Sequence, residues 1–366
     1  MSGAAKPRVI DLALQGGGAH GALTWGVLDR LLADPRIEIS SLSGTSAGAM
    51  NAVVLADGFQ RDGREGARQA LHEFWQAVSE AARLSPIQRS FWGRLSGSWS
   101  LDSSPGYLFF EQLTRQFSPY ELNPLNINPL RELLASSIDF ERVNACSAIK
   151  VFVTATNVRT GRGRTFTQPE LSADSVMASA CLPFIYQAVE IDGEAYWDGG
   201  YIGNPALYPL VEDTATRDLV IVQINPLVRE NLPRTGRAII NRINEITFNA
   251  SLVKELRAIE LLHQLIDAEG LESERYRAIL VHLIHADEEL KDLDASSKLN
   301  AEWTFLQHLK RRGEAWAERF LERHYDDLGV RSSFDLKSLF TDCFRHPDVA
   351  AGEENPSPDA HGGAER

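Results

Sequence analysis

The sequence predicts an α/β fold, in which helices flank a central, mainly parallel β-sheet, with a helical C-terminal extension. Two strand–loop–helix units follow one another within the first 60 residues. Consecutive strands that are joined by one crossover helix are typical of a parallel sheet. Apolar residues at helical spacing dominate from about residue 235, which predicts the helical extension.

The first unit consists of a strand, a glycine loop and a helix. Residues 9–14 read Val-Ile-Asp-Leu-Ala-Leu and are followed by glycines at 16–18. A short apolar run that stops at glycines is typical of a buried strand. The helix after it is expected to end near Asp34-Pro35, because proline does not continue a helix.

The second unit repeats this order, with a strand at 37–42, a loop at 43–48 and a helix at 49–56. A further helix is predicted over residues 61–83, where apolar side chains share one face. Additional strands are predicted at residues 151–156, 193–197, 219–224 and 277–286.

Residues 86–129 differ in composition from the segments around them. They are rich in Pro, Ser, Gly, Asn and aromatic residues, and the aromatic residues follow no helical or strand periodicity. We predict a long irregular insertion here. It is either a lid or pocket wall, or a small satellite core under a long loop. Its aromatic residues include Phe91, Trp92, Trp99, Tyr107, Phe109, Phe110 and Phe117.

Composition and charge exclude several classes of protein. The chain has 366 residues, of which 43% are hydrophobic and 24% charged, which excludes fibrous and wholly disordered proteins. Its net charge of -13 argues against nucleic acid as a partner, and against an anionic membrane held by charge alone. Only three cysteines, no secretory signal and no apolar run near the ~20 residues of a membrane span favour a cytoplasmic protein with peripheral membrane contact at most.

A Gly-x-Ser-x-Gly motif, Gly44-Thr45-Ser46-Ala47-Gly48, lies between the second strand and its helix. A nucleophile elbow needs a sharp strand-to-helix turn with small neighbours, so that the serine hydroxyl points outward. Ser46 is therefore the candidate nucleophile. The alternative interpretation is a glycine-rich helix cap without chemistry.

The first loop reads Gly16-Gly17-Gly18-Ala19-His20-Gly21, which also fits a dinucleotide-binding pattern. That interpretation needs an acidic residue near the end of the second strand, where the chain instead has Ser46 and its neighbours. Exposed amides of Gly16, Gly17 and Gly18 would suit an oxyanion hole, because backbone donors stabilise a tetrahedral intermediate.

A nucleophilic serine needs a base, and Asp198 is the candidate. It ends a predicted short strand and precedes Gly199 and Gly200. Seven of the nine histidines follow it, but none lies in a glycine-rich turn, and most fall in predicted helix or strand. Because a carboxylate of ordinary pKa is a weak base, burial is expected to raise the pKa of Asp198. The alternative is a turn aspartate before two glycines.

The three motifs, in this order, make residues 9–211 similar to the patatin-like phospholipase family. The resemblance implies an acyl hydrolase with Ser46 as nucleophile, Asp198 as proton acceptor and the Gly16–Gly18 loop as oxyanion hole, with Gly21, Gly44, Gly48, Gly199 and Gly200 as motif residues. Residues 178–183 and 203–205 also resemble stretches that flank the family's aspartate.

Two residues depart from the family pattern. His20 stands where the first loop often carries Arg or Lys, and Gln15 replaces a frequently acidic residue. If the usual cation helps to hold an anionic head group, His20 argues against recognition driven by phosphate.

Three regions are expected along the chain. The resemblance implies a catalytic domain at 9–211, and the residue pattern predicts a continuation of the core sheet with a mainly helical region at 212–345. The Pro-, Gly-, Glu- and Ala-rich composition of residues 346–366 predicts a disordered tail. No cofactor and no metal are required. The expected substrate is a lipid or another acyl ester, with transient, peripheral membrane contact and no nucleic acid. A protein partner for the C-terminal helices stays unidentified.

The expected activity is that of a phospholipase A or lysophospholipase. An esterase or thioesterase, or a depolymerase of an intracellular polyester, could use the same pair of residues. A non-enzymatic scaffold is the third alternative, although it would not need serine, aspartate and glycine loop together.

Overall fold

A mixed sheet of eight strands forms the centre of the computed structural model, which describes residues 6–83, 85–229, 232–270, 277–285, 287–290 and 293–341. The strands are β1 Arg8–Leu14, β2 Ile37–Gly44, β3 Lys150–Asn157, β4 Gly163–Thr167, β5 Val189–Ile191, β6 Glu194–Asp198, β7 Asp218–Val222 and β8 Leu280–Ile284.

The strand order is β5-β6-β3-β2-β1-β7-β8, and β4 also pairs with β3. The pairs that join β3, β2, β1, β7 and β8 are parallel, whereas β4, β5 and β6 pair in antiparallel fashion. The prediction of a mainly parallel sheet is confirmed, and every predicted strand is present. Because β7 and β8 extend the sheet beyond β1, the chain after residue 211 contributes to the same core as the chain before it.

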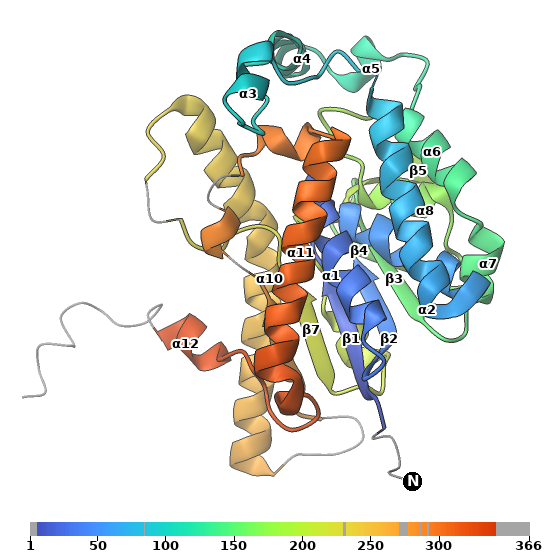
Figure 1. Cartoon of the computed structure of the whole chain (residues 1–366), viewed down its shortest axis with the longest axis vertical. Coiled ribbons are helices and arrows are strands. Elements are labelled where there is room, and N and C mark those ends of the chain that lie inside the picture. Colours follow the sequence, from blue (N-terminus) through green and yellow to red (C-terminus); the bar gives the residue numbers. More distant parts are fainter. Residues whose placement is uncertain are drawn as a thin grey trace, which may run out of the picture. The chain divides into compact units, whose positions relative to one another are not determined.

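The helices and 3-10 turns fill the connections between strands (Figure 1). The helices are α1 Gly21–Ala33, α2 Ala47–Ala82, α3 Phe91–Leu95, α4 Pro105–Gln116, α5 Pro119–Leu122, α6 Pro129–Ser137, α7 Phe140–Ala145, α8 Ala173–Ser179, α9 Tyr208–Glu212, α10 Gly236–Glu269, α11 Trp303–His324 and α12 Leu336–Thr341. The 3-10 turns are η1 Gly18–His20, η2 Gly199–Tyr201, η3 Asp287–Leu290, η4 Ser296–Leu299 and η5 Tyr325–Asp327.

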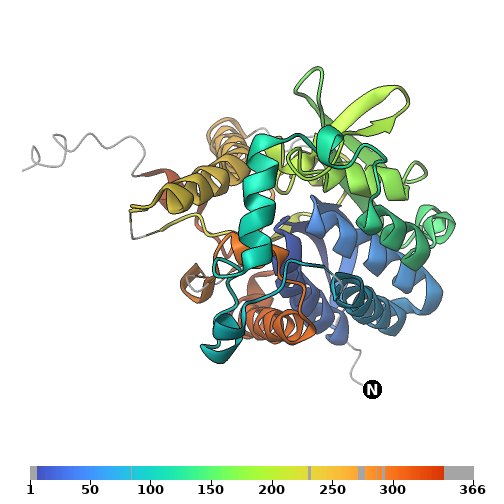
Figure 2. The same ribbon diagram turned by 90° about the horizontal axis from the view of Figure 1, so that it is seen from above.

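Both faces of β1 are buried, as the apolar run predicts. Ile10, Leu12 and Leu14 belong to a core cluster with α1, α2 and α11, which pack together on one face of the sheet. Ala13 on the opposite face is also fully buried, and α10 lies on that side (Figures 1 and 2).

Helix α2 combines the two helices predicted at 49–56 and 61–83. Its path is interrupted at Asp62 (φ -154°) and Gly63 (φ 55°), where the backbone leaves the helical region. The predicted break is therefore present but lies a few residues further along the chain.

The insertion at 86–129 is more regular than the sequence predicts, because it contains α3, α4 and α5. Ser104 and Ser118 cap α4 and α5, and a proline opens each helix. A serine cap followed by proline starts a helix even where no apolar period is visible. The three helices lie beyond the carboxyl ends of β1 and β2 (Figure 1). None of the α4 residues is buried, which argues against a satellite core there.

Residues up to Phe334 form one compact unit and residues 335–366 a second one, whose described part holds α12. The tail expected at 346–366 lies outside the described residues. Within the described residues, no helix is both long and apolar enough to cross a membrane.

Candidate active site

Ser46 occupies a strained turn between β2 and α2. Its φ of 55° and ψ of -122° lie outside the region that ordinary residues prefer. Such strain at a strand-to-helix turn is typical of a nucleophile elbow. A Cβ on Gly48 would lie 2.1 Å from the Leu14 carbonyl oxygen, and one on Gly44 would lie 2.5 Å from the Gly48 backbone. Only glycine at these two positions lets the turn close against β1.

The amide of Ser46 is held by two consecutive hydrogen bonds. It donates to Ser179 Oγ at 3.0 Å, and Ser179 Oγ donates to the Thr154 carbonyl at 2.6 Å. Ser179 ends α8, and Thr154 lies in β3. The elbow is thus tied to two further elements of the core.

The glycine loop after β1 contains both engaged and open amides. Gly16 N donates to Asn204 Oδ1 at 2.7 Å. Within the described part of the chain, no acceptor is found for the amides of Gly17, which is half-buried, and Gly18, which is exposed. Gly21 opens α1, where a Cβ would lie 2.7 Å from Ala47 Cβ. The Gly16 amide is thus already engaged, whereas the amides of Gly17 and Gly18 stay open toward the cavity side of the loop.

Asp198 ends β6, directly before Gly199 and Gly200 of η2, and its side chain is only 2% exposed. The amide of Gly200 donates to Asp198 Oδ1 at 2.7 Å. Burial raises the pKa of Asp198 to about 7, and this outweighs the lowering by the Gly200 amide, the Ser46 hydroxyl and Lys298. The expected direction of the shift is confirmed, and the Ser46 hydroxyl lies near enough to lower the pKa of the carboxyl group.

These residues meet in one cavity of about 110 Å³, which gathers the predicted nucleophile, base and glycine loop. The motif residues Gly21, Gly44, Gly48, Gly199 and Gly200 do not line it, but shape the backbone around it. The lining residues are Gly16, Gly17, Gly18, Ser46, Leu182, Asp198, Asn204, Asn225, Phe248, Lys298 and Leu299.

A second, larger cavity of about 740 Å³, which we call the apolar groove, has a mostly apolar lining. Its lining includes the sequence neighbours of residues in the first cavity: Trp197 precedes Asp198, and Pro183 follows Leu182. Residues of the insertion also line it, including Phe117 at the end of α4. This apolar groove could hold a hydrocarbon chain beside the small polar cavity.

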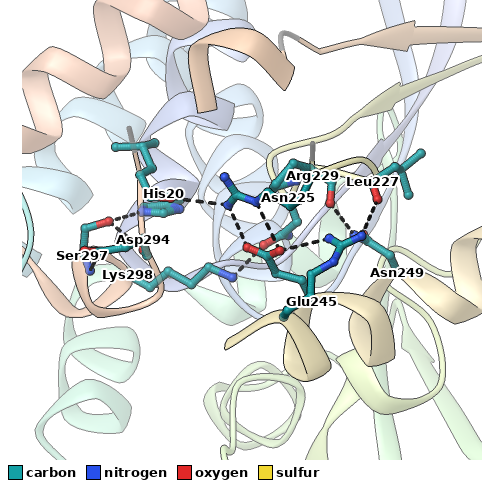
Figure 3. A network of polar contacts seen from close by, with 12 residues as sticks. His20, Asn225, Leu227, Arg229, Glu245, Asn249, Asp294, Ser297 and Lys298 are labelled. Carbon is teal, nitrogen blue, oxygen red and sulfur yellow. Dashed lines mark hydrogen bonds and ion pairs between the residues drawn. The ribbon is translucent and has the colours of Figure 1, made fainter. Parts of the chain in front are cut away.

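Sequence reasoning missed several residues of the cavity. Asn204 lies in a stretch that resembles the family, so its role could have been suspected. Asn225, Phe248 and Lys298 come from residues beyond 211 without any motif around them. Figure 3 shows Lys298 and Asn225 in a polar network that also includes Glu245 and Arg229.

The two departures from the family pattern have structural explanations. Gln15 is fully buried and ties the glycine loop to other segments: Nε2 donates to the Asn204 carbonyl and to Asn249 Oδ1, and Oε1 accepts from the amides of Ile224 and Asn225. An amide can donate and accept at once, which a carboxylate cannot.

His20 does not line the cavity. Its Nε2 lies 2.8 Å from Ser297 Oγ, and burial together with nearby cations lowers its pKa well below the usual range. The histidine is therefore uncharged at neutral pH, and the first loop brings no positive side chain of its own.

Among the other histidines, His282 is wholly buried between Asp218 Oδ1 at 3.0 Å and Ser333 Oγ at 2.9 Å. The same Asp218 oxygen accepts from the Gly329 amide, so this group fastens the segment after η5 to the beginning of β7. In the described ranges, no group of three or more His, Cys, Asp or Glu side chains could hold a metal ion.

Comparison with solved structures finds likenesses at low identity and low TM-score. VipD from Legionella pneumophila matches at 14% identity and a TM-score of 0.35, over 84% of this chain and 67% of that one. ExoU from Pseudomonas aeruginosa, in complex with SpcU, matches at 16% and 0.31, over 87% and 53%. A second ExoU structure matches at 14% and 0.25, over 84% and 53%. The chain spans about half to two thirds of the length of these proteins.

No curated protein sequence matches the chain. The model of the family described as patatin-like phospholipase, in contrast, matches residues 12–211, more than half of the chain. This range includes all three glycine motifs and agrees with the predicted extent of the resemblance. The chain therefore belongs to the patatin-like phospholipase family and is an ester hydrolase of that family.

Proposed function

We propose that the protein hydrolyses carboxylic esters of lipids through a Ser46–Asp198 dyad. One observation carries the proposal: Asp198 is buried, has a pKa raised to about 7 and lines, together with Ser46, a cavity that two open glycine amides also line. A base with a pKa near the working pH is well suited to proton transfer. Among the residues that the structure describes, no histidine lines this cavity, so the carboxylate accepts the proton directly.

In the first step, Ser46 Oγ attacks the ester carbonyl carbon while its proton passes to Asp198. The carbonyl oxygen becomes an oxyanion, which the amides of Gly17 and Gly18 stabilise. The position of Ser46 at the amino end of α2 adds the positive end of the helix dipole. When the intermediate collapses, the bond to the alcohol breaks, Asp198 returns the proton to that alcohol, and an acyl group remains on Ser46.

In the second step, water attacks the acyl carbon and gives its proton to Asp198. The same two amides hold the second oxyanion. Collapse of the intermediate breaks the bond to Ser46 Oγ, which takes the proton back from Asp198, and the fatty acid leaves. Each group returns to its starting state without a cofactor.

The apolar groove supports a lipid substrate. Its position beside the polar cavity would place a hydrocarbon chain next to a carbonyl carbon at Ser46. Exposed apolar side chains on the insertion also suit transient contact with a membrane surface. Among them are Phe109, 67% exposed on α4, and Leu125, 81% exposed after α5.

A substrate panel tests the function itself. We expect hydrolysis of a diacyl phospholipid, a lysophospholipid or both in mixed micelles, with loss of turnover in Ser46→Ala. Hydrolysis of an acyl thioester or a short polyester at a much higher kcat/KM than any lipid ester would move the assignment to the alternative substrates. Turnover of none of these would contradict it.

The activity should depend on pH through Asp198. Because the base must be ionised, kcat/KM is expected to rise with pH and to level off above about 7, the raised pKa of Asp198. Below that value it should fall about tenfold per pH unit, since the ionised fraction falls in this way. Initial rates with a short-chain p-nitrophenyl ester between pH 5 and 9 measure this curve. A flat profile over that range would contradict the proposed base.

The membrane contact should depend on the insertion and not on charge. The double variant Phe109→Ser/Leu125→Ser is expected to bind zwitterionic vesicles several-fold more weakly, because two exposed apolar side chains are lost. Its kcat/KM on a dissolved short-chain ester should stay unchanged, since neither residue lines the cavity or the groove.

Val330→Ser is the control, because Val330 is 66% exposed but lies away from the insertion. It follows Gly329, which contacts the first residue of β7, whereas the insertion lies beyond the carboxyl ends of the neighbouring parallel strands. Flotation assays with vesicles of both charges measure the binding. Tight binding only to anionic vesicles would contradict an apolar contact.

A further inference from the structure

The chain beyond the family segment brings a lysine into the cavity. Lys298 lies in η4 and lines the cavity with Ser46 and Asp198. In the described part of the chain, Asp198 and Lys298 are the two lining residues with charged side chains. The family model ends at residue 211, so no motif in its segment accounts for this lysine.

The position of η4 is fixed from two sides. On one side, Ser297 Oγ lies 2.8 Å from His20 Nε2 at the glycine loop. On the other side, Ser296 Oγ accepts from the Leu101 amide at 2.9 Å, and Asn300 Nδ2 donates to the Trp99 carbonyl at 3.0 Å. Lys298 is therefore placed by the glycine loop and by the base of the insertion.

The backbone of η4 also touches the glycine loop directly. The Lys298 carbonyl oxygen would lie 2.5 Å from a Cβ on Gly18, whose φ is 58°. Any side chain at Gly18 would thus collide with η4 and be strained in its backbone. The open amide of Gly18 is held at this position by a segment about 280 residues further along the chain.

The Lys298 side chain is connected to the same loop. Its Nζ donates to Asn225 Oδ1 at 2.7 Å. Asn225 Nδ2 in turn donates to the Gly16 carbonyl at 2.7 Å and to Gln15 Oε1 at 3.2 Å. A continuous chain of hydrogen bonds therefore runs from the ammonium group to the backbone of the glycine loop. Figure 3 shows Lys298 and Asn225, where this chain begins.

Several charged groups face Lys298. Glu245 of α10 and Asp198 favour its charged form, whereas Arg229 disfavours it. Glu245 is shared with Arg229 and Arg242, whose guanidinium groups lie 2.7 Å and 3.0 Å from its oxygens. Removal of the ammonium group from water is the largest effect and lowers the pKa of Lys298. The neutral His20 contributes no charge of its own.

We propose that Lys298 is a positioning residue of the active site, which holds the glycine loop through Asn225 and supplies the positive charge that the loop's own His20 lacks. The proposal rests on the proposed Ser46–Asp198 chemistry. The fixed charge stabilises the carboxylate of Asp198 before the reaction and the oxyanion during it. The lysine forms no bond with substrate in this role.

Three variants separate charge from packing. Lys298→Gln keeps a donor for Asn225 Oδ1 but removes the charge, whereas Lys298→Arg keeps the charge. Lys254→Gln is the matched control, because Lys254 is exposed on α10 and loses the same charge outside the site. The substrate is a short-chain p-nitrophenyl ester, which carries no phosphate, so head-group binding does not enter the result.

For Lys298→Gln we expect kcat to fall at least about tenfold, with a smaller change in KM, because the charge acts on the transition state. The acid limb of the pH profile, which is the fall of kcat/KM below about pH 7, should move to higher pH. The reason is that Lys298 lowers the pKa of Asp198 in the wild type. Lys298→Arg should restore the acid limb. At pH values above the plateau that Asp198 sets, deprotonation of Lys298 is expected to lower the wild-type rate. This alkaline fall should be absent from Lys298→Arg, because arginine keeps its proton.

An unmoved acid limb and an unchanged kcat in Lys298→Gln would overturn the proposal. Equal losses of kcat in Lys298→Gln and Lys298→Arg, with the acid limb at its wild-type pH in both variants, would also overturn the proposal. That result would indicate a packing role alone. If Lys298→Gln does not fold, an alkaline fall that persists in Lys298→Arg contradicts the proposal by itself. Failure of the dyad is recognised separately, since an acid limb that survives in Asp198→Asn would exclude Asp198 as the base whatever Lys298 does.

Discussion

Replacing Ser46 with alanine is expected to lower kcat on any ester substrate by about 10⁴-fold or more, the size of effect seen when a nucleophile is removed from a serine hydrolase. Without the hydroxyl, no acyl-enzyme can form. The fold should be retained, because the Ser46 amide, and not its hydroxyl, is tied to Ser179. Initial rates and a thermal melt of the purified variant measure both expectations.

The matched control is Ser96→Ala, because Ser96 is exposed and bonds only the nearby Gly93 carbonyl. This variant should keep wild-type kcat. Activity of Ser46→Ala within tenfold of the wild type would show that another group attacks the ester, and the dyad would have to be abandoned.

Replacing Asp198 with asparagine is the second change with a large expected effect. We expect kcat to fall by about 10³-fold or more, because asparagine keeps the shape and the acceptor for the Gly200 amide but cannot take a proton. The remaining rate should no longer show the limb near pH 7 that belongs to Asp198.

The melting temperature gives this variant a second readout. In the folded protein the pKa of Asp198 is raised, so ionising this carboxyl group above that pKa costs folding free energy that asparagine does not cost. At pH 8 the Asp198→Asn variant should therefore melt no earlier than the wild type. The control is Asp267→Asn, at an exposed position of α10, which should change neither kcat nor the pH profile.

Much of the fold could be predicted from local pattern. The strand at 9–14, the glycine loop and the elbow at Ser46 are signals within a few residues of each other, and each corresponds to a structural element. The apolar run of β1 is informative because both of its faces are buried. Each of the three motifs is weak alone, but their occurrence together in a fixed order indicated the family that the comparison then established.

The short helices of the insertion show a signal that was present but not used. Their apolar residues have no helical period, since α4 buries none of its side chains. The capping serines followed by Pro105 and Pro119 nevertheless mark the beginnings of α4 and α5. Capping chemistry was a better guide here than hydrophobic periodicity.

The remainder of the site depends on contacts that no local pattern reveals. Gly16 and Asn204 are 188 residues apart, and Lys298 and Asn225 are 73 apart. Which glycine amide stays open is decided by Asn204, and which cation faces the cavity is decided by the fold of η4. Neither follows from residue type or spacing.

The most direct test of the account is the intact mass of the protein after incubation with a fluorophosphonate, followed by peptide mapping. We predict one adduct on the wild type, located on Ser46, and none on Ser46→Ala. An adduct on another serine, or an equal adduct on the alanine variant, would contradict the assignment of Ser46 as the nucleophile.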